Sequence, residues 1–309
     1  MVNNVADKEI GIPFDIRQKV IASTTSESWR NAPHVSYLYE ADVTSFMEQF
    51  QELNHGKKKT EKITLNTVLM RIIIEGIKSA PQVNAHISFN NWLASGRVTQ
   101  FNTIDINMPM LLLNGQMVTT RLPDFGNKTL EQMTCYINLL IKRLNNTDID
   151  AALLDVSMND TIKKLKQGDL FQVLGRILGK TCGKNRIKNV PSKNSKLNDK
   201  IPESERLSRQ DLNQGTITIS NLGSAVRGTK GIVGLIDLIP PQVFAIGIGA
   251  LQEVPGVYQD ENSISQIGIR KIIPFCLVFD HRALDFGNVA PFILRMEEIF
   301  KQPEVILTW

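Results

Sequence analysis

The sequence predicts an α+β fold in which helices pack against a mixed β-sheet. Segments with the 3.6-residue apolar period of amphipathic helices are interspersed with short apolar or alternating runs that are typical of strands. These segments do not follow the regular strand–helix–strand alternation that produces an all-parallel sheet. With 309 residues, 42% of them hydrophobic, the chain is long enough and apolar enough to bury a large core.

The first half of the chain supplies three predicted helices and several strands. Apolar periodicity predicts the helices 16–23, 43–53 and 65–80, and Pro81 ends the third because it cannot continue a helix. Runs of β-forming residues predict strands at 34–39, 98–101, 105–113 and 116–121. The last two strands flank Asn114-Gly115, which is the strongest short signal for a β-hairpin.

The second half continues the same mixture. A helix is predicted at 129–144, and three short apolar runs bounded by Gly and Pro, at 216–219, 243–248 and 272–279, predict central strands. A final helix is expected at 289–300. The longest apolar stretch, 232–251, is interrupted by Asp237 and Pro240-Pro241, so it predicts a turn and a buried strand and not a membrane span.

Composition excludes several classes of protein. A net charge of +4 on a chain of this size does not indicate a nucleic-acid binder, and the N-terminus has no apolar segment typical of a signal peptide. Cys135, Cys182 and Cys276 are sparse, odd in number and without metal-ligand spacing. They fit a reducing compartment, so we expect a cytoplasmic protein without a bound metal.

Residues 151–206 differ from the rest and are predicted to be a basic insertion within a single domain, 1–309. Between residues 151 and 200, eleven Lys or Arg face four Asp. Apolar residues from Leu170 to Leu178 line one face of a predicted helix, and a polar, Pro-interrupted loop follows. Such a helix suits either packing on its own domain or subunit neighbour, or binding to a partner or an anionic membrane.

The first candidate for chemistry is the sequence Asp280-His281-Arg282-Ala283-Leu284-Asp285, at the end of a predicted strand. A histidine that leaves a buried strand is held by a rigid sheet and, being mostly neutral at cellular pH, is able to accept a proton. The spacing alone fits a structural histidine at least as well. The remaining histidines, His34, His55 and His86, are predicted to be structural or exposed.

The second candidate is the run from Gly215 to Gly223, in which a predicted strand ends in Ser220-Asn221. A hydroxyl and an amide beside a glycine-rich backbone are groups that can stabilise a developing oxyanion. A simple strand end with turn residues explains the same pattern.

Taken together and in this order, the two clusters resemble the catalytic domain of the dihydrolipoyl acyltransferase component of 2-oxo acid dehydrogenase complexes. That family shares the two-layer, trimer-forming fold of chloramphenicol acetyltransferase. Three further stretches resemble the family: IRQKVIAST, INMPMLLLNGQMVTTRL and LIPPQVFAIGIGALQEVP. The resemblance covers 12–150 and 207–303, and leaves the insertion outside.

The resemblance implies a role for each matching residue. His281 would take the proton from an attacking thiol, and Ser220 of a neighbouring subunit in a homotrimer would hydrogen-bond the tetrahedral oxyanion. Asp285 would organise the site and form an ion pair with Arg17. Coenzyme A would be one substrate, and the residues that bind it are not identified. Phe286 departs from the family, which usually has glycine directly after the aspartate.

The resemblance also bears on partners. The sequence shows no lipoyl domain, so the expected acceptor is a separate lipoylated protein or a small thiol. The apolar tail PEVILTW is expected either to dock into another trimer, building a larger cage, or to pack on its own sheet.

Two alternatives remain open from the sequence. The first is a non-catalytic trimeric scaffold that uses the basic insertion to bind a partner or membrane. The second is an acetyltransferase for a small hydroxyl compound, and Asp280, where that branch has a second histidine, speaks against it.

Overall fold

The computed structural model describes residues 14–112, 115, 117–149, 152, 201–225, 229–260 and 262–309. The chain divides into two compact units, Met1–Ser23 with Thr147–Pro202, and Thr24–Asn146 with Glu203–Trp309. The second unit contains the sheet, His281 and Ser220, and the description below concerns this unit. Most of the basic insertion lies outside the described residues.

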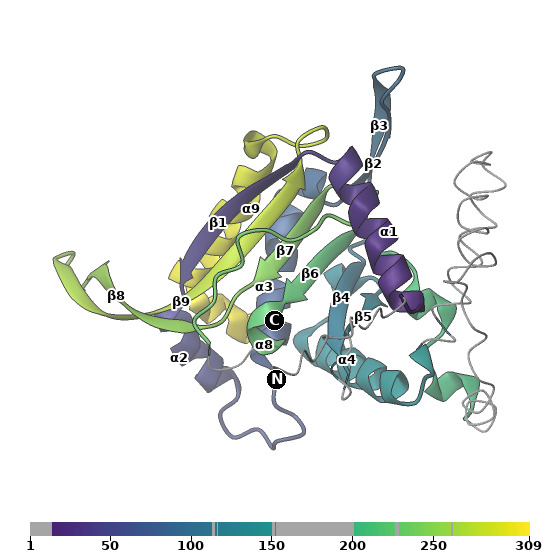
Figure 1. The fold of residues 1–309 in the computed structure, drawn as a ribbon. Coiled ribbons are helices and arrows are strands. Elements are labelled where there is room, and N and C mark those ends of the chain that lie inside the picture. Colours follow the sequence, from purple (N-terminus) through teal and green to yellow (C-terminus); the bar gives the residue numbers. More distant parts are fainter. Residues whose placement is uncertain are drawn as a thin grey trace, which may run out of the picture. The chain divides into compact units, whose positions relative to one another are not determined.

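The described helices and strands follow the predicted mixture (Figure 1). The helices are α1 (Ile16–Asn31), α2 (Thr44–Leu53), α3 (Leu65–Ser79), α4 (Leu130–Asn145), α8 (Leu222–Ala225) and α9 (Phe286–Lys301). The strands are β1 (His34–Asp42), β2 (Ala85–Asn90), β3 (Ser95–Gln100), β4 (Ile106–Leu111), β5 (Met117–Leu122), β6 (Ile217–Asn221), β7 (Phe244–Ile248), β8 (Gln252–Gln259) and β9 (Ser265–Asp280).

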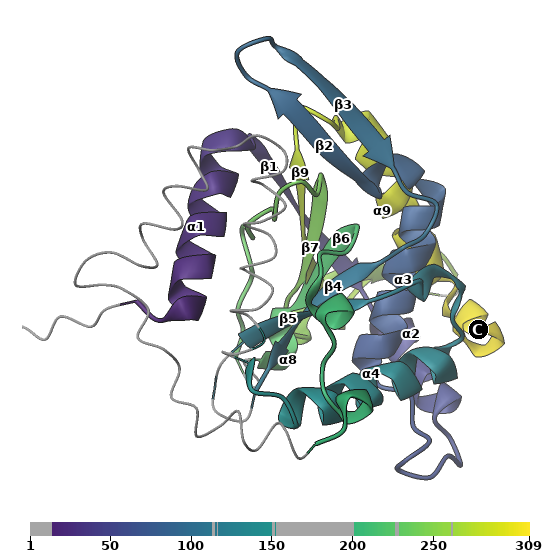
Figure 2. The ribbon, with the colours of Figure 1, turned by 90° about the vertical axis from the view of Figure 1, so that its right-hand side faces the viewer.

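One mixed sheet forms the centre of the unit. Its strand order is β1-β9-β7-β6-β4-β5, and β8 pairs with the outer half of β9. The pairs β4–β6 and β6–β7 are parallel and the others are antiparallel. Strands β2 and β3 form a separate two-stranded ribbon that projects beyond the sheet (Figures 1 and 2). The α+β prediction with a mixed sheet is confirmed.

Helices α2, α3 and α9 cover one face of this sheet (Figure 2). Phe244 of β7 packs edge-on against Phe292 of α9, and Phe275 of β9 lies against Phe300. Helix α3 approaches α9 closely because Gly76 has no side chain; a Cβ there would lie 2.7 Å from the Phe292 ring. The core is therefore built between the sheet and these helices.

A different element covers part of the other face. Val233 and Ile236, from the extended segment before β7, pack against buried side chains of the sheet and its approach, namely Leu238, Ala245, Cys276 and Val278. The side chain of Ser36 on β1 ties down this segment by donating a hydrogen bond to the Gly234 carbonyl at 2.6 Å. This part of the second sheet face is therefore covered by the irregular segment before β7 and not by a helix.

Most predicted elements occur, with shifted ends. The helix predicted at 16–23 continues to Asn31, and the strand predicted at 272–279 belongs to a strand of 16 residues, Ser265–Asp280. Strands β2 and β8 were not predicted, because both are largely solvent-facing and lack a buried apolar run. None of the helices in the described ranges is long and apolar enough to cross a membrane.

The C-terminal tail packs on the chain's own helices and not on its sheet. The 3₁₀ segment Pro303–Thr308 contacts α2, and Ile306 is fully buried. The Arg71 guanidinium of α3 lies 5.6 Å from the centre of the Trp309 ring. The prediction that the tail packs on the sheet is wrong, and the prediction that it reaches another trimer stays a prediction.

Candidate active site

His281 lies on a tight turn directly after the central strand β9. Strands β1 and β7 flank β9 on both sides, which holds its end in place. The His281 backbone N–H donates to the Pro33 carbonyl at 3.0 Å, and the N–H groups of Ala283 and Leu284 both donate to the Asp280 carbonyl. The turn is thus fully hydrogen-bonded, and the side chain of His281 is exposed on it.

The surroundings of the His281 ring determine which nitrogen carries the proton. Nδ1 lies 3.0 Å from the Leu284 carbonyl oxygen. Because a carbonyl can only accept, the neutral ring donates from Nδ1 and keeps the lone pair on Nε2. The ring also stands edge-on to Phe279, 5.9 Å away. These contacts orient an imidazole whose Nε2 is able to take a proton.

An internal ion pair braces the same turn. Asp280 is almost fully buried, and its carboxylate accepts from the Arg282 guanidinium at 2.6 and 3.0 Å and from the Arg282 backbone N–H at 2.9 Å. Such two-pronged Arg–carboxylate pairs are directional and strong. This role of Asp280 and Arg282 was not predicted from the sequence, although the adjacency of Asp, His and Arg was a signal for it.

Asp285 has a structural role that the sequence did not predict. Its carboxylate accepts from the Asn288 N–H at 3.1 Å, and the Asn288 side chain accepts from the Asp285 N–H at 2.9 Å, so the two form a capping box at the start of α9. The side chain of Arg17 lies outside the described residues, so the predicted Arg17–Asp285 ion pair stays a prediction.

Phe286, the residue that departs from the family pattern, is the first residue of α9. Its ring stands edge-on to Tyr37 of β1, with 5.1 Å between the ring centres, and both side chains are exposed. Phe286 therefore joins an aromatic pair on the surface of the unit.

Ser220 lies near the end of β6, between β7 and β4. Its neighbour Asn221 points toward α3, where its side chain donates to Asn66 at 2.8 Å. Successive side chains alternate across a strand, so Ser220 points to the opposite face of the sheet. Ser220 is buried, and no side chain or backbone group in the described ranges hydrogen-bonds its hydroxyl.

Glycines allow close packing around Ser220. Gly247 pairs with Ser220 on β7, and a Cβ at Gly247 would lie 3.3 Å from Ile236. A Cβ at Gly223 would lie only 2.2 Å from the Gly249 carbonyl oxygen. Any larger residue at Gly223 would push away the turn that follows Ser220.

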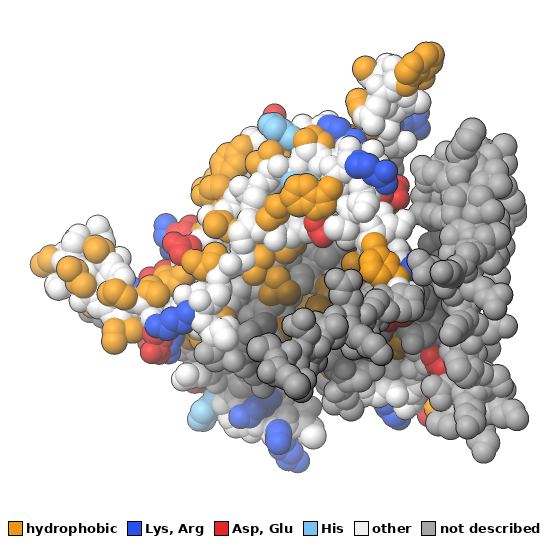
Figure 3. Space-filling view, viewed as in Figure 1, with side chains coloured by type: hydrophobic (Ala, Val, Ile, Leu, Met, Phe, Trp, Pro, Cys, Tyr) orange, Lys and Arg blue, Asp and Glu red, His pale blue; other side chains and the backbone are white. Residues whose placement is uncertain are grey.

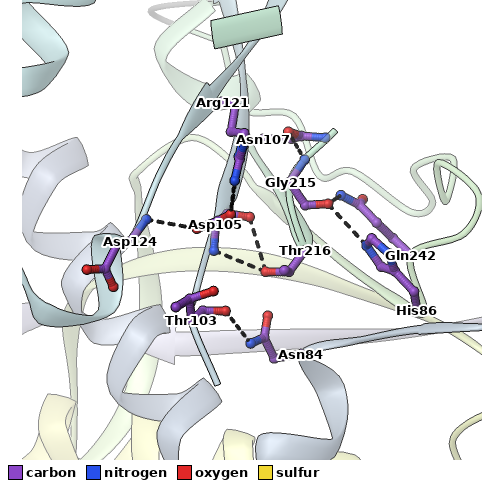
Figure 4. A network of polar contacts seen from close by, with 10 residues as sticks. All are labelled: Asn84, His86, Thr103, Asp105, Asn107, Arg121, Asp124, Gly215, Thr216 and Gln242. Atoms are coloured by element: carbon purple, nitrogen blue, oxygen red, sulfur yellow. Dashed lines mark hydrogen bonds and ion pairs between the residues drawn. The ribbon is translucent and has the colours of Figure 1, made fainter. Parts of the chain in front are cut away.

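A network of polar contacts anchors the beginning of β6 (Figure 4). The Asn107 side chain accepts from the Gly215 N–H at 2.7 Å, and Asp105 accepts from Thr216 and, through its carboxylate, from Arg121. The Gly215 carbonyl accepts from both Gln242 and His86. Burial lowers the pKa of His86, and its hydrogen bond to Gly215 opposes this effect. His86 is therefore structural, as predicted.

A single chain does not bring His281 and Ser220 together. Ser220 pairs with Gly247, which pairs with Cys276. His281 lies five residues further along the chain from Cys276. Five residues along β9 and two strands across correspond to roughly 19 Å. His281 and Asp285 share one turn, whereas Ser220 lies elsewhere on the sheet.

No group of three potential metal ligands occurs among the residues that the structure describes. The chemistry that these residues support is proton transfer at Nε2 of His281 and hydrogen bonding by the Ser220 hydroxyl.

Comparison with known proteins identifies the family. The family model of the 2-oxoacid dehydrogenases acyltransferase (catalytic domain) matches residues 6–155 and 180–308, which is most of the chain. The chain belongs to this family. Membership of a family of acyltransferase catalytic domains favours the catalytic prediction over the scaffold alternative.

Curated relatives of this acyltransferase domain are components of a dehydrogenase complex and of an acetoin cleaving system. The lipoamide acyltransferase component of the branched-chain alpha-keto acid dehydrogenase complex of Pseudomonas putida is 24% identical over 94% of this chain. The dihydrolipoyllysine-residue acetyltransferase component of the acetoin cleaving system of Bacillus subtilis is 21% identical over 96% of this chain. The chain spans about half the length of these relatives (52% and 56%).

Solved structures show the same fold. The cubic core of a pyruvate dehydrogenase multienzyme complex has a TM-score of 0.64 at 17% identity, over 99% of this chain and 98% of that one. A probable dihydrolipoamide acetyltransferase of Listeria monocytogenes also has a TM-score of 0.64, at 16% identity, over 96% of both chains. The fold prediction made from the resemblance is thereby confirmed.

Proposed function

We propose that this acyltransferase domain moves an acyl group between coenzyme A and a dihydrolipoyl-type thiol by general-base catalysis. The orientation of His281 carries the proposal. The Leu284 carbonyl holds the proton on Nδ1, so Nε2 is a basic nitrogen exposed at the end of a rigid strand. This is the arrangement that a positioned general base requires.

The reaction follows from this arrangement. His281 takes the proton of the attacking thiol, because the thiolate is the nucleophile and a thiol of ordinary pKa is mostly protonated at neutral pH. The thiolate attacks the thioester carbonyl, and the Ser220 hydroxyl donates to the resulting oxyanion. When the tetrahedral intermediate collapses, the C–S bond to the original thiol breaks, and His281 returns the proton to the leaving thiolate. No covalent enzyme intermediate forms.

We infer that the site is shared between subunits. Roughly 19 Å separates His281 from Ser220 along the sheet of one chain, too far for both to act on one carbonyl. In a homotrimer, His281 of one chain would meet Ser220 of the next. Ser220 lies on the sheet face opposite the one that Asn221 turns toward α3, and its hydroxyl makes no hydrogen bond among the described residues, which leaves it available for a substrate.

Further assignments belong to the same proposal. Residues 1–309 form one catalytic domain, with 151–206 as an insertion. Asp285 organises the site through an ion pair with Arg17. The acceptor is a separate lipoylated protein or a small thiol, and the sparse cysteines suit the cytoplasm. The names of the relatives, which include lipoamide acyltransferase, support the choice of acceptor.

The test is transfer from acyl-coenzyme A donors to dihydrolipoamide, followed by mass spectrometry. We expect His281→Ala to lower kcat about 10²- to 10⁴-fold, as for loss of a positioned base. Ser220→Ala should lower kcat about 10²- to 10³-fold, as for loss of one oxyanion donor. His55→Ala is the control, because His55 is an exposed histidine on a distant loop. Equal activity of wild type and His281→Ala would contradict the proposal.

Co-expression of the His281→Ala and Ser220→Ala chains tests whether the site is shared. Every homotrimer-like ring that contains both chains has one site of three that pairs an intact histidine with an intact serine from another chain, so about a third of wild-type activity should return. A site contained in one chain would give no recovery. The mixed oligomers must be purified with both chains present, for example by different affinity tags.

A further inference from the structure

The β2–β3 ribbon carries the most exposed large aromatic side chain of the described residues. Trp92 at its tip is 90% exposed, and the adjacent Leu93 is 61% exposed. Figure 3 shows hydrophobic side chains at this projecting tip. Tryptophan at a protein surface is typical of binding hot spots, because it brings a large contact area at a small cost in side-chain entropy.

The tip is held in a defined shape. The Asn90 side-chain oxygen accepts from the backbone N–H groups of both Trp92 and Leu93, at 2.9 and 3.0 Å. Opposite Phe89, Gly96 leaves no room for a side chain, because a Cβ would lie 2.7 Å from the Ser88 carbonyl oxygen. A preorganised loop loses little conformational entropy when it binds, which favours recognition.

The ribbon has one apolar and one polar face. Cross-strand pairing places Ile87 beside Val98 and Phe89 beside Gly96, whereas Ser88 pairs with Arg97 on the other face. Between Ala85 and Gln100 there is no carboxylate, and Arg97 is the only Lys or Arg. The ribbon therefore suits a partner with apolar and acidic side chains on its contact surface.

The β2–β3 ribbon is connected to the turn that holds His281 at more than one point along β2. The Arg282 guanidinium lies 5.4 Å from the centre of the Phe89 ring, a cation–π contact. The Ile87 N–H donates to the Pro241 carbonyl, and the Val243 N–H donates to the Ala85 carbonyl. The Val243 carbonyl in turn accepts from the Asp280 N–H. Backbone hydrogen bonds therefore link the β2–β3 ribbon, through residues 241–243, to the turn that carries His281.

We propose that the β2–β3 ribbon is the docking arm for the folded domain that carries the acceptor thiol. This inference rests on the proposed function. The acceptor thiol must come to Nε2 of His281, so in this proposal the folded part of the carrier domain rests on the surface beside the His281 turn. Trp92 lies three residues beyond Phe89, or roughly 10 Å, which places the tip where such a body would rest.

The experiment compares two acceptors that differ only in the carrier. One is free dihydrolipoamide, and the other is a purified protein domain bearing dihydrolipoyl-lysine. We expect Trp92→Ala and Leu93→Ala to raise KM for the protein-bound acceptor about tenfold, the size of a typical hot-spot loss. The kinetic constants for free dihydrolipoamide and the oligomer mass should not change. Trp92→Phe, which keeps an aromatic anchor, should restore most of the affinity.

Thr99→Ala is the matched control, because Thr99 is exposed on the polar face of the same ribbon. Equal losses with both acceptors would overturn the inference, since the tip would then act on the site itself. A fall in oligomer mass, measured by light scattering, would overturn it in favour of a contact between subunits. Unchanged KM values for the protein-bound acceptor would also overturn it.

A binding measurement separates this inference from the proposed function. An isotope-labelled carrier domain is titrated with the full chain and followed by NMR. If no variant or wild type transfers acyl groups but the carrier binds and Trp92→Ala weakens binding, the docking arm stands and the acyltransferase proposal fails. If wild type transfers to free dihydrolipoamide but the carrier neither binds nor reacts, only the docking arm fails.

Discussion

At the scale of the residue, the His281 turn shows how local contacts prepare a side chain for chemistry. A lone histidine four residues before an aspartate is a weak signal, because it fits a structural role equally well. The hydrogen bond to the Leu284 carbonyl holds the ring proton of His281 on Nδ1, which prepares Nε2 to act as a base. The ion pair between Asp280 and Arg282 stabilises the turn. The relevant groups are neighbours in sequence, but their orientation is visible only in the folded turn.

Asp285 illustrates two roles that mutation can separate. Asparagine caps helices about as well as aspartate, whereas alanine does not. We expect Asp285→Ala to lower the free energy of unfolding by about 1 kcal/mol and Asp285→Asn to leave it nearly unchanged, measured by urea denaturation. If the charge of Asp285 also organises the site, Asp285→Asn and Arg17→Gln should lower kcat to the same extent. Full activity in both would leave Asp285 as a helix cap only.

At the scale of the element, strand β6 is positioned by polar contacts at its beginning and by glycines at its end. His86 joins β2 to the Gly215 carbonyl just before β6, and Gly223 permits the tight turn after Ser220. Neither contact follows from apolar periodicity, which is why the strand was predicted but its anchoring was not.

His86 makes stability depend on pH. Burial lowers its pKa in the folded state below the ordinary value of 6.5, so the unfolded chain binds more protons as the pH falls. The stabilising contribution of neutral His86 to the free energy of unfolding is therefore complete well above pH 6.5 and is lost progressively as the pH falls below it. We expect the free energy of unfolding to fall less between pH 7 and pH 5.5 in His86→Gln than in wild type. Urea denaturation at both pH values measures this, and parallel pH profiles would contradict it.

At the scale of the whole molecule, the C-terminal tail contributes to the stability of its own chain. Ile306 is fully buried against α2. Removing a buried isoleucine side chain costs about 2–5 kcal/mol, so Ile306→Ala should shift the urea midpoint clearly. The matched control is Leu307→Ala, because Leu307 is 45% exposed. A small effect at Ile306 and a large one at Leu307 would instead indicate that the tail is buried in an assembly.

The separation of His281 and Ser220 also belongs to this scale. Each residue was identified from its own segment, and the resemblance to a family implied that the two meet between subunits. The sheet register places them at different levels and two strands apart within one chain, which supports the proposal of a shared site. If the site is shared between subunits, acyltransferase activity should depend on formation of the oligomer.

The amino-acid sequence alone predicted the α+β class, most of the helices and central strands, and the two candidate catalytic clusters. It did so because apolar periodicity and turn residues are local properties of the chain. The strand order, the anchoring of β6 and the contacts that join the β2–β3 ribbon to the His281 turn became visible only in the folded chain. These features depend on contacts between segments far apart in sequence, where register and packing, and not local propensity, determine which groups meet.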